Sequence, residues 1–69
     1  MITTTDAKTR VAQERADLLQ RIDKLYHFMH CCIEYDNLSR AQRKLLRKQL
    51  RVMNRYQHIL LKRLTIWDN

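Results

Sequence analysis

The sequence predicts an all-α fold: one domain over residues 1–69, folded as an antiparallel helical hairpin of two long helices that assembles into a homo-oligomeric helical bundle. The 69 residues contain no glycine and no proline, the residues that most readily form tight turns and break helices. Apolar residues recur at three- and four-residue steps in two long segments, which is typical of amphipathic helices. A chain of about 60 residues buries only roughly 60% of its unfolded surface, so copies are expected to associate.

The first helix is expected over about residues 5–33. Its apolar residues recur at steps of seven, four, three, four and three, which draws one stripe along a helix. Leu19, Tyr26 and Ile33 are expected to widen this stripe, and Arg15 interrupts it. The stripe consists of Val11, Leu18, Ile22, Leu25, Met29 and Cys32.

A turn is expected over about residues 34–39, where Asp36, Asn37 and Ser39 favour local bonds to the backbone. Asn37 is expected to take the left-handed conformation that ends the first helix. Ser39, with Gln42 three residues later, matches a capping box that opens a second helix over about residues 39–66.

The second helix has two apolar seams side by side. A single partner helix covers one seam, so the other is expected to meet a further copy of the chain, in a dimer or a higher assembly. The first seam is Leu45, Val52, Tyr56, Ile59 and Ile66, and the second seam is Leu46, Leu50, Met53, Leu60, Leu64 and Trp67.

The net charge of +7 resides in the second half of the chain. Residues 1–36 have five basic and six acidic side chains, net −1, whereas residues 37–69 have nine basic side chains and one acidic, net +8. A strongly basic segment predicts an anionic partner.

No segment resembles a signal peptide or a membrane span, and the adjacent Cys31 and Cys32 suit a reducing compartment. We therefore expect a cytoplasmic protein without a membrane partner.

One face of the second helix forms a basic ladder, with steps of four, three, four, four and seven residues. Its like charges repel, which weakens the helix unless an anion compensates them. The ladder either keeps the protein soluble or binds an anion. The anion would be the phosphates of a nucleic acid, a nucleotide, or an acidic surface of a partner protein. Its members are Arg40, Lys44, Arg47, Arg51, Arg55 and Lys62.

A polar row of Gln49, Tyr56 and Arg63, seven residues apart, lies within the apolar face of the second helix. Arg63 comes level with residues 10–14 in a hairpin, so a pair with Glu14 is one explanation. The other is a ligand pocket between subunits, in which arginine takes a phosphate and tyrosine stacks on a base. Arg15 fits either arrangement.

Catalysis and metal binding have little support in the sequence. No nucleophile has a base and an orienting group at a recognisable spacing, so the protein is not expected to be an enzyme. The histidines and cysteines lack the spacing of zinc sites, and neither a metal nor a cofactor is expected. Phe28 and Tyr35, seven residues apart near the turn, form either a contact for a partner protein or a third packing surface in a larger oligomer.

The chain resembles a family of small helical-hairpin phage proteins related to one first noted in a crAss-like phage. The resemblance lies in RIDKLYHFM over residues 21–29 and LLRKQLRVMNRYQHILLKRL over residues 45–64. It implies a phage accessory protein that acts in the host cytoplasm against host defence or on a host protein. The matching positions are Lys24, Leu25, Phe28, Leu45, Leu46, Gln49, Leu50, Met53, Tyr56, Ile59, Leu60 and Arg63.

Together these observations predict a non-enzymatic protein that counters host defence by binding, most concretely by sequestering a small anionic nucleotide signal at subunit interfaces. Arg63, Tyr56, Gln49 and Arg15 are the predicted ligand-binding residues. One alternative is a nucleic-acid-binding module that uses the basic ladder. The other is an inhibitor that binds an acidic host protein.

Overall fold

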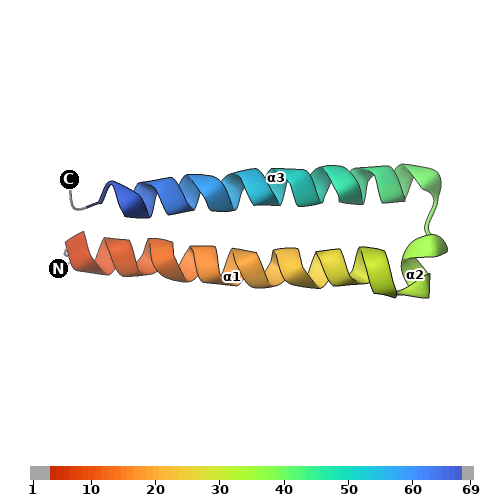
Figure 1. Cartoon of the computed structure of the whole chain (residues 1–69), viewed down its shortest axis with the longest axis horizontal. Helices are drawn as coiled ribbons and strands as arrows, with labels where there is room; N and C mark the ends of the chain where they lie inside the picture. The colour runs from red at the N-terminus through yellow and green to blue at the C-terminus, as the bar shows by residue number, and fades with distance from the viewer. Residues whose placement is uncertain (1–3, 68–69) are drawn as a thin grey trace.

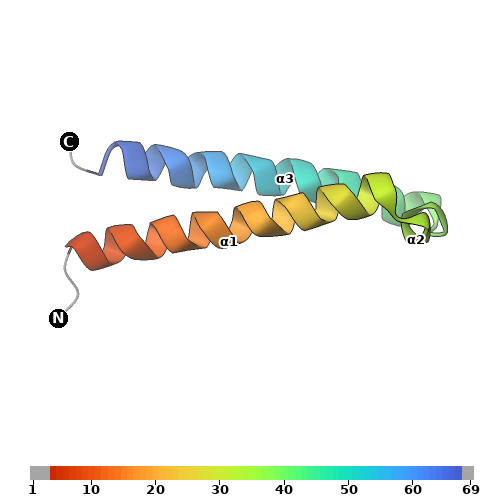
Figure 2. The ribbon, with the colours of Figure 1, turned by 60° about the horizontal axis from the view of Figure 1, so that its bottom comes forward.

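The computed structural model describes residues 4–67 and consists of helices connected by short turns. The long helices α1 (Thr4–Cys31) and α3 (Arg40–Thr65) run antiparallel and lie side by side along the molecule, and the short helix α2 (Ile33–Asp36) lies at the turn between them (Figures 1 and 2). The molecule is a rod of 48 × 18 × 15 Å. The predicted all-α hairpin of two long helices that pack together is confirmed.

The turn differs from the prediction, because the first helix ends at Cys31 instead of continuing to about residue 33. Cys32 has extended backbone angles, φ −111° and ψ 130°, and α2 then fills part of the expected turn. The break at Cys32 lets Tyr35 pack against the hairpin, where it is buried. Its ring contacts that of Phe28 edge to face, with centroids 6.0 Å apart. Asn37 has the backbone angles of the right-handed helical region, with φ −82°, so the prediction that it takes the left-handed conformation is wrong.

Helix α3 begins as the sequence predicts. The Ser39 hydroxyl oxygen accepts a hydrogen bond of 3.1 Å from the backbone N–H of Gln42, which satisfies one of the free N–H groups at the helix start. At the other end the N–H of Ile66 donates to the carbonyl of Lys62. Both ends of α3 are therefore stabilised without glycine.

The core is a narrow line of contact between α1 and α3. Leu60 of α3 is fully buried, and Val11 and Leu18 of α1 are 6% and 8% exposed. Each fully buried side chain of this kind stabilises the fold by about 1.5–3 kcal/mol. The prediction that α1 covers one seam of α3 is confirmed, because Met53, Leu64 and Trp67 of the second seam pack against this core.

The first seam lies outside this contact. Leu45, Val52, Ile59 and Ile66 are 55–64% exposed, and Tyr56 is 41% exposed. Leu19 and Tyr26 of α1 and Ile33 of α2 are also exposed, so they do not widen the buried stripe within one chain as expected. The physical reason is that two helices touch along one line only, which leaves the flanks of both helices uncovered.

Candidate functional site

Two pairs of polar residues flank the contact between α1 and α3. On one flank, the Tyr56 hydroxyl donates a hydrogen bond to the Glu14 carboxylate. On the other, the Arg15 guanidinium donates from Nε and Nη2 to the Gln57 side-chain oxygen, at 3.3 and 3.1 Å. Tyr56 and Gln57 are neighbours in α3, and neighbouring residues of a helix point about 100° apart. Leu60 follows them by four and three residues and therefore points between them, so the two pairs lie on opposite sides of the buried Leu60. The hairpin thus has two chemically different flanks.

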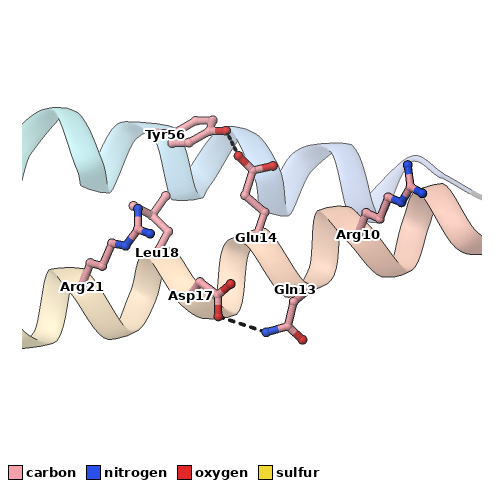
Figure 3. Close-up of a pocket in the computed structure, with 7 residues that line it drawn as sticks. All are labelled: Arg10, Gln13, Glu14, Asp17, Leu18, Arg21 and Tyr56. Carbon is pink, nitrogen blue, oxygen red and sulfur yellow. Dashed lines mark hydrogen bonds between the residues drawn. The ribbon is translucent and has the colours of Figure 1, made fainter.

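The Tyr56 flank contains an open hollow of about 410 Å³ (Figure 3). Tyr56 comes from α3, and the other lining residues come from α1. Figure 3 shows the Glu14 carboxylate beneath the Tyr56 hydroxyl, with Arg10 and Arg21 further along α1 in opposite directions. The hollow is lined by Arg10, Gln13, Glu14, Asp17, Leu18, Arg21 and Tyr56.

The charges around Tyr56 hold its phenol in the neutral form. The hydrogen bond to Glu14 raises the pKa of Tyr56 above its ordinary value of 10.0, because the phenol proton bonds to a negative oxygen. Desolvation and the negative charge of Glu14 raise this pKa further, while the positive charge of Arg63 lowers it. Tyr56 is therefore a hydrogen-bond donor near neutral pH, and Arg63 is close enough to act on it electrostatically.

The four predicted ligand-binding residues do not form one site within a single chain. Tyr56 lines the hollow. Gln49 is exposed two turns earlier on α3 and donates to the Met53 sulfur at 3.9 Å, and Arg63 is exposed two turns later. Within one chain Arg15 lies on the opposite flank, where it bonds to Gln57.

The partner of Glu14 in the structure also differs from the one that the sequence suggests. The sequence suggested Arg63, but the hydrogen bond that the structure shows for Glu14 is the one from Tyr56. Tyr56 lies two turns nearer to the hairpin turn than Arg63, and this register places its hydroxyl directly against Glu14. Arg63 is exposed.

Sequence reasoning missed the arginines of the hollow. Arg10, Glu14, Asp17 and Arg21 follow each other at steps of four, three and four, so they share one face of α1. This spacing is the signal that also identified the basic ladder, but here acids lie between the arginines. Gln57, the buried polar residue that bonds Arg15, was also missed.

The basic ladder lies on the side of α3 that faces away from α1. Its six side chains are exposed, and among residues 4–67 the structure shows no hydrogen bond or ion pair to any of them. Two hollows open on this face. Lys44, Arg47, Lys48 and Arg51 line one of about 340 Å³ together with Leu45. Arg55, His58, Ile59 and Lys62 line the other, of about 460 Å³.

Within residues 4–67, no three histidine, cysteine or acidic side chains lie close enough to hold a metal ion. His30 instead stacks on Tyr26, with ring centroids 4.1 Å apart. None of the helices in this part of the chain is long and apolar enough to cross a bilayer.

Comparison with known proteins identifies the family. The family model described as Sequestin matches residues 5–66, a range that includes every residue of the hollow and of the basic ladder. No curated protein and no solved structure matches the chain. Because the match covers nearly the whole sequence, this chain belongs to the Sequestin family.

Proposed function

We propose that this protein is a non-enzymatic phage accessory protein that counters host defence in the host cytoplasm by sequestering a small anionic nucleotide. The family description, Sequestin, is consistent with a binding and sequestering role. The resemblance to phage helical-hairpin proteins supports the anti-defence setting. The observation that carries the proposal is the exposed Tyr56 ring, which lies over a hollow flanked by two guanidinium groups.

The hollow has the groups that a nucleotide needs. The guanidinium fork of Arg10 or Arg21 fits two phosphate oxygens, and the Tyr56 ring offers a face on which a base stacks. The carboxylates of Glu14 and Asp17 accept hydrogen bonds only, which suits ribose hydroxyls or a base amino group. The mixture favours a nucleotide over inorganic phosphate, because a phosphate dianion has only one O–H donor for the two carboxylates, whereas a nucleotide adds ribose hydroxyls or a base amino group.

Assembly through the first seam would complete the site. A two-fold axis beside Tyr56 brings Val52 opposite Ile59 of the second copy, and Leu45 opposite Ile66 of the second copy, in antiparallel register. The two exposed apolar seams then cover each other. An isologous contact of this kind uses the same patch on both chains and closes as a dimer.

The same axis also pairs the polar row with itself. Tyr56 comes beside Tyr56 of the second copy, and Gln49 comes level with Arg63 of the second copy. In an antiparallel pair of helices these residues lie on the same side of the contact, next to the hollows. The predicted ligand-binding residues Gln49, Tyr56 and Arg63, which are separate in one chain, would thus form one interfacial site with two arginines.

Docking on a host protein through Phe28 and Tyr35 has less support. Tyr35 is buried and its ring packs against Phe28, which is half-buried. The two rings stabilise the turn, so they are not an open contact surface.

Native mass spectrometry tests the proposed function. Purified protein is mixed with a panel of mono- and dinucleotides, and the spectrum gives the subunit number and the bound mass together. We expect a dimer or higher assembly that retains a discrete nucleotide mass, and loss of this mass in Arg63→Ala and in Tyr56→Ala. Arg47→Ala, on the opposite side of α3, is the matched control and should keep the ligand. Full retention by Arg63→Ala would rule out the interfacial site.

A further inference from the structure

The basic ladder is separate from the nucleotide site. Leu60 marks the side of α3 that touches α1, and the ladder residues lie roughly half a turn of the helix away from it. The hollow that contains Tyr56 includes none of them. The ladder therefore needs an explanation of its own.

The ladder has the length and shape of a phosphate-binding surface. From Arg40 to Lys62 it runs along about 33 Å of helix, at 1.5 Å per residue. One turn of B-form DNA is about 34 Å long, and its major groove is about 12 Å wide, enough to admit an α-helix. Helix α1 lies along one side of α3 (Figures 1 and 2). The ladder side chains, roughly half a helical turn away from that contact, are exposed in the described part of the chain and can approach a duplex.

The charge on this surface is uncompensated. The ladder side chains make no hydrogen bond or ion pair within the described residues 4–67, and residues 37–67 include no acidic residue. Neighbouring like charges at steps of three and four repel each other. Basic side chains line most of two hollows on this face, of about 340 and 460 Å³, and Leu45 and Ile59 at the edge of the first seam complete their linings.

A duplex fits this surface better than a single strand does. Proteins that bind single strands combine positive charge with aromatic side chains on which bases stack. The ladder and its two hollows contain no phenylalanine, tyrosine or tryptophan. Without a stacking platform, the available interaction is with the backbone phosphates alone.

We propose that the outer face of α3 binds double-stranded DNA through its phosphates, as a second binding surface independent of the nucleotide site. The contact is electrostatic and does not read base sequence, since long basic side chains on phosphates fix position without specifying bases. A protein with both surfaces would be held on DNA while its other flank captures a nucleotide.

The test is the salt dependence of binding to a fluorescently labelled duplex of about 20 base pairs, about two helical turns, followed by anisotropy. Six phosphate contacts give a slope of log K against log [salt] of about −5, and roughly a 10³-fold loss of affinity between about 50 and 200 mM salt. Arg47→Gln with Arg51→Gln should bring the slope to about −3.5, since each contact contributes about −0.9.

A matched pair of single variants controls for net charge. Lys44→Gln removes a ladder lysine and should reduce the magnitude of the slope by about one, whereas Lys24→Gln removes an exposed lysine of α1 and should leave it unchanged. Equal effects of the two variants, an unchanged slope in the Arg47 and Arg51 variant, or equal binding to polyglutamate would overturn the proposal. Tighter binding to a single strand than to the duplex would also overturn it.

The result of the DNA-binding test does not depend on the proposed nucleotide binding. Nucleotide retention by the Arg47 and Arg51 variant is measured in the same preparation by native mass spectrometry. Loss of DNA binding with retained nucleotide separates the two surfaces. Failure of nucleotide binding in the wild type, with the DNA slope intact, would remove the proposed function and leave the DNA surface in place.

Discussion

Replacing Val52 and Ile59 with glutamine tests whether the first seam joins two copies of the chain. These side chains are 58% and 55% exposed in the single chain. Complete burial of a valine or isoleucine is worth about 1.5–3 kcal/mol, so covering the exposed half is worth about 1 kcal/mol per side chain. A two-fold interface contains each residue twice, and the double substitution therefore weakens the dimer by about 4 kcal/mol. This corresponds to roughly a 10³-fold increase in the dissociation constant.

Sedimentation equilibrium measures this change directly. We expect the wild type to sediment as a dimer or higher assembly at micromolar concentration, and the variant as a monomer under the same conditions. Ala12→Gln with Ala16→Gln is the matched control, because both alanines are exposed on α1 and lie away from the first seam. Circular dichroism of each variant checks that the helices remain folded.

Two results would refute this reasoning. If the variant sediments with the same mass as the wild type, another surface holds the copies together. The exposed Leu19 and Tyr26 of α1 and Ile33 of α2 then become the interface to examine. If the wild type is monomeric at concentrations where it binds nucleotide, the ligand site is complete in one chain. The two-fold arrangement of the polar row is then wrong.

Three further predictions concern the single chain. Leu60→Ala empties the one fully buried side-chain position that the structure describes, and should lower the free energy of unfolding in urea by about 2–5 kcal/mol. Glu14→Gln removes the negative acceptor and should lower the pKa of Tyr56, as read from phenolate absorbance. In the wild type, the stability from this bond is fully present below pH 10.0 and is lost as pH rises through the raised pKa. Arg51→Glu places an acid between basic neighbours one turn away on either side and should stabilise the helix by about 1 kcal/mol, seen as a higher melting temperature.

The periodicity of apolar residues was sufficient to predict the two long helices and that one of the two seams packs between them, but not which seam it is. Steps of three and four residues are set by helix geometry, and Ser39 bonds to the next turn through its own hydroxyl. The break at Cys32 could not be predicted in this way. The apolar pattern continues through Ile33, and the helix ends early because Tyr35 gains burial against Phe28, which is a tertiary effect.

The candidate site was harder to predict, because it depends on how the two helices are aligned. A polar row on one helix shows which residues share a face, but the partner of each residue depends on the register of the other helix. A shift of two turns decides whether Glu14 meets Arg63 or Tyr56. The same alignment places Arg15 on the far flank with Gln57, a pairing that neither helix shows alone.

The two surfaces differ in how their charges are balanced, and this difference predicts different ligand preferences. Around Tyr56 the positive charges of the arginines are balanced by carboxylates of the same helix. The charge of a ligand therefore contributes little to its affinity there, and the ligand must also stack on the Tyr56 ring and donate hydrogen bonds. On the outer face of α3 no acid offsets the ladder, so any array of phosphates at suitable spacing is attracted. Added salt should therefore weaken DNA binding steeply and nucleotide binding only slightly. Affinities that fell in parallel with salt would mean that both ligands use the ladder.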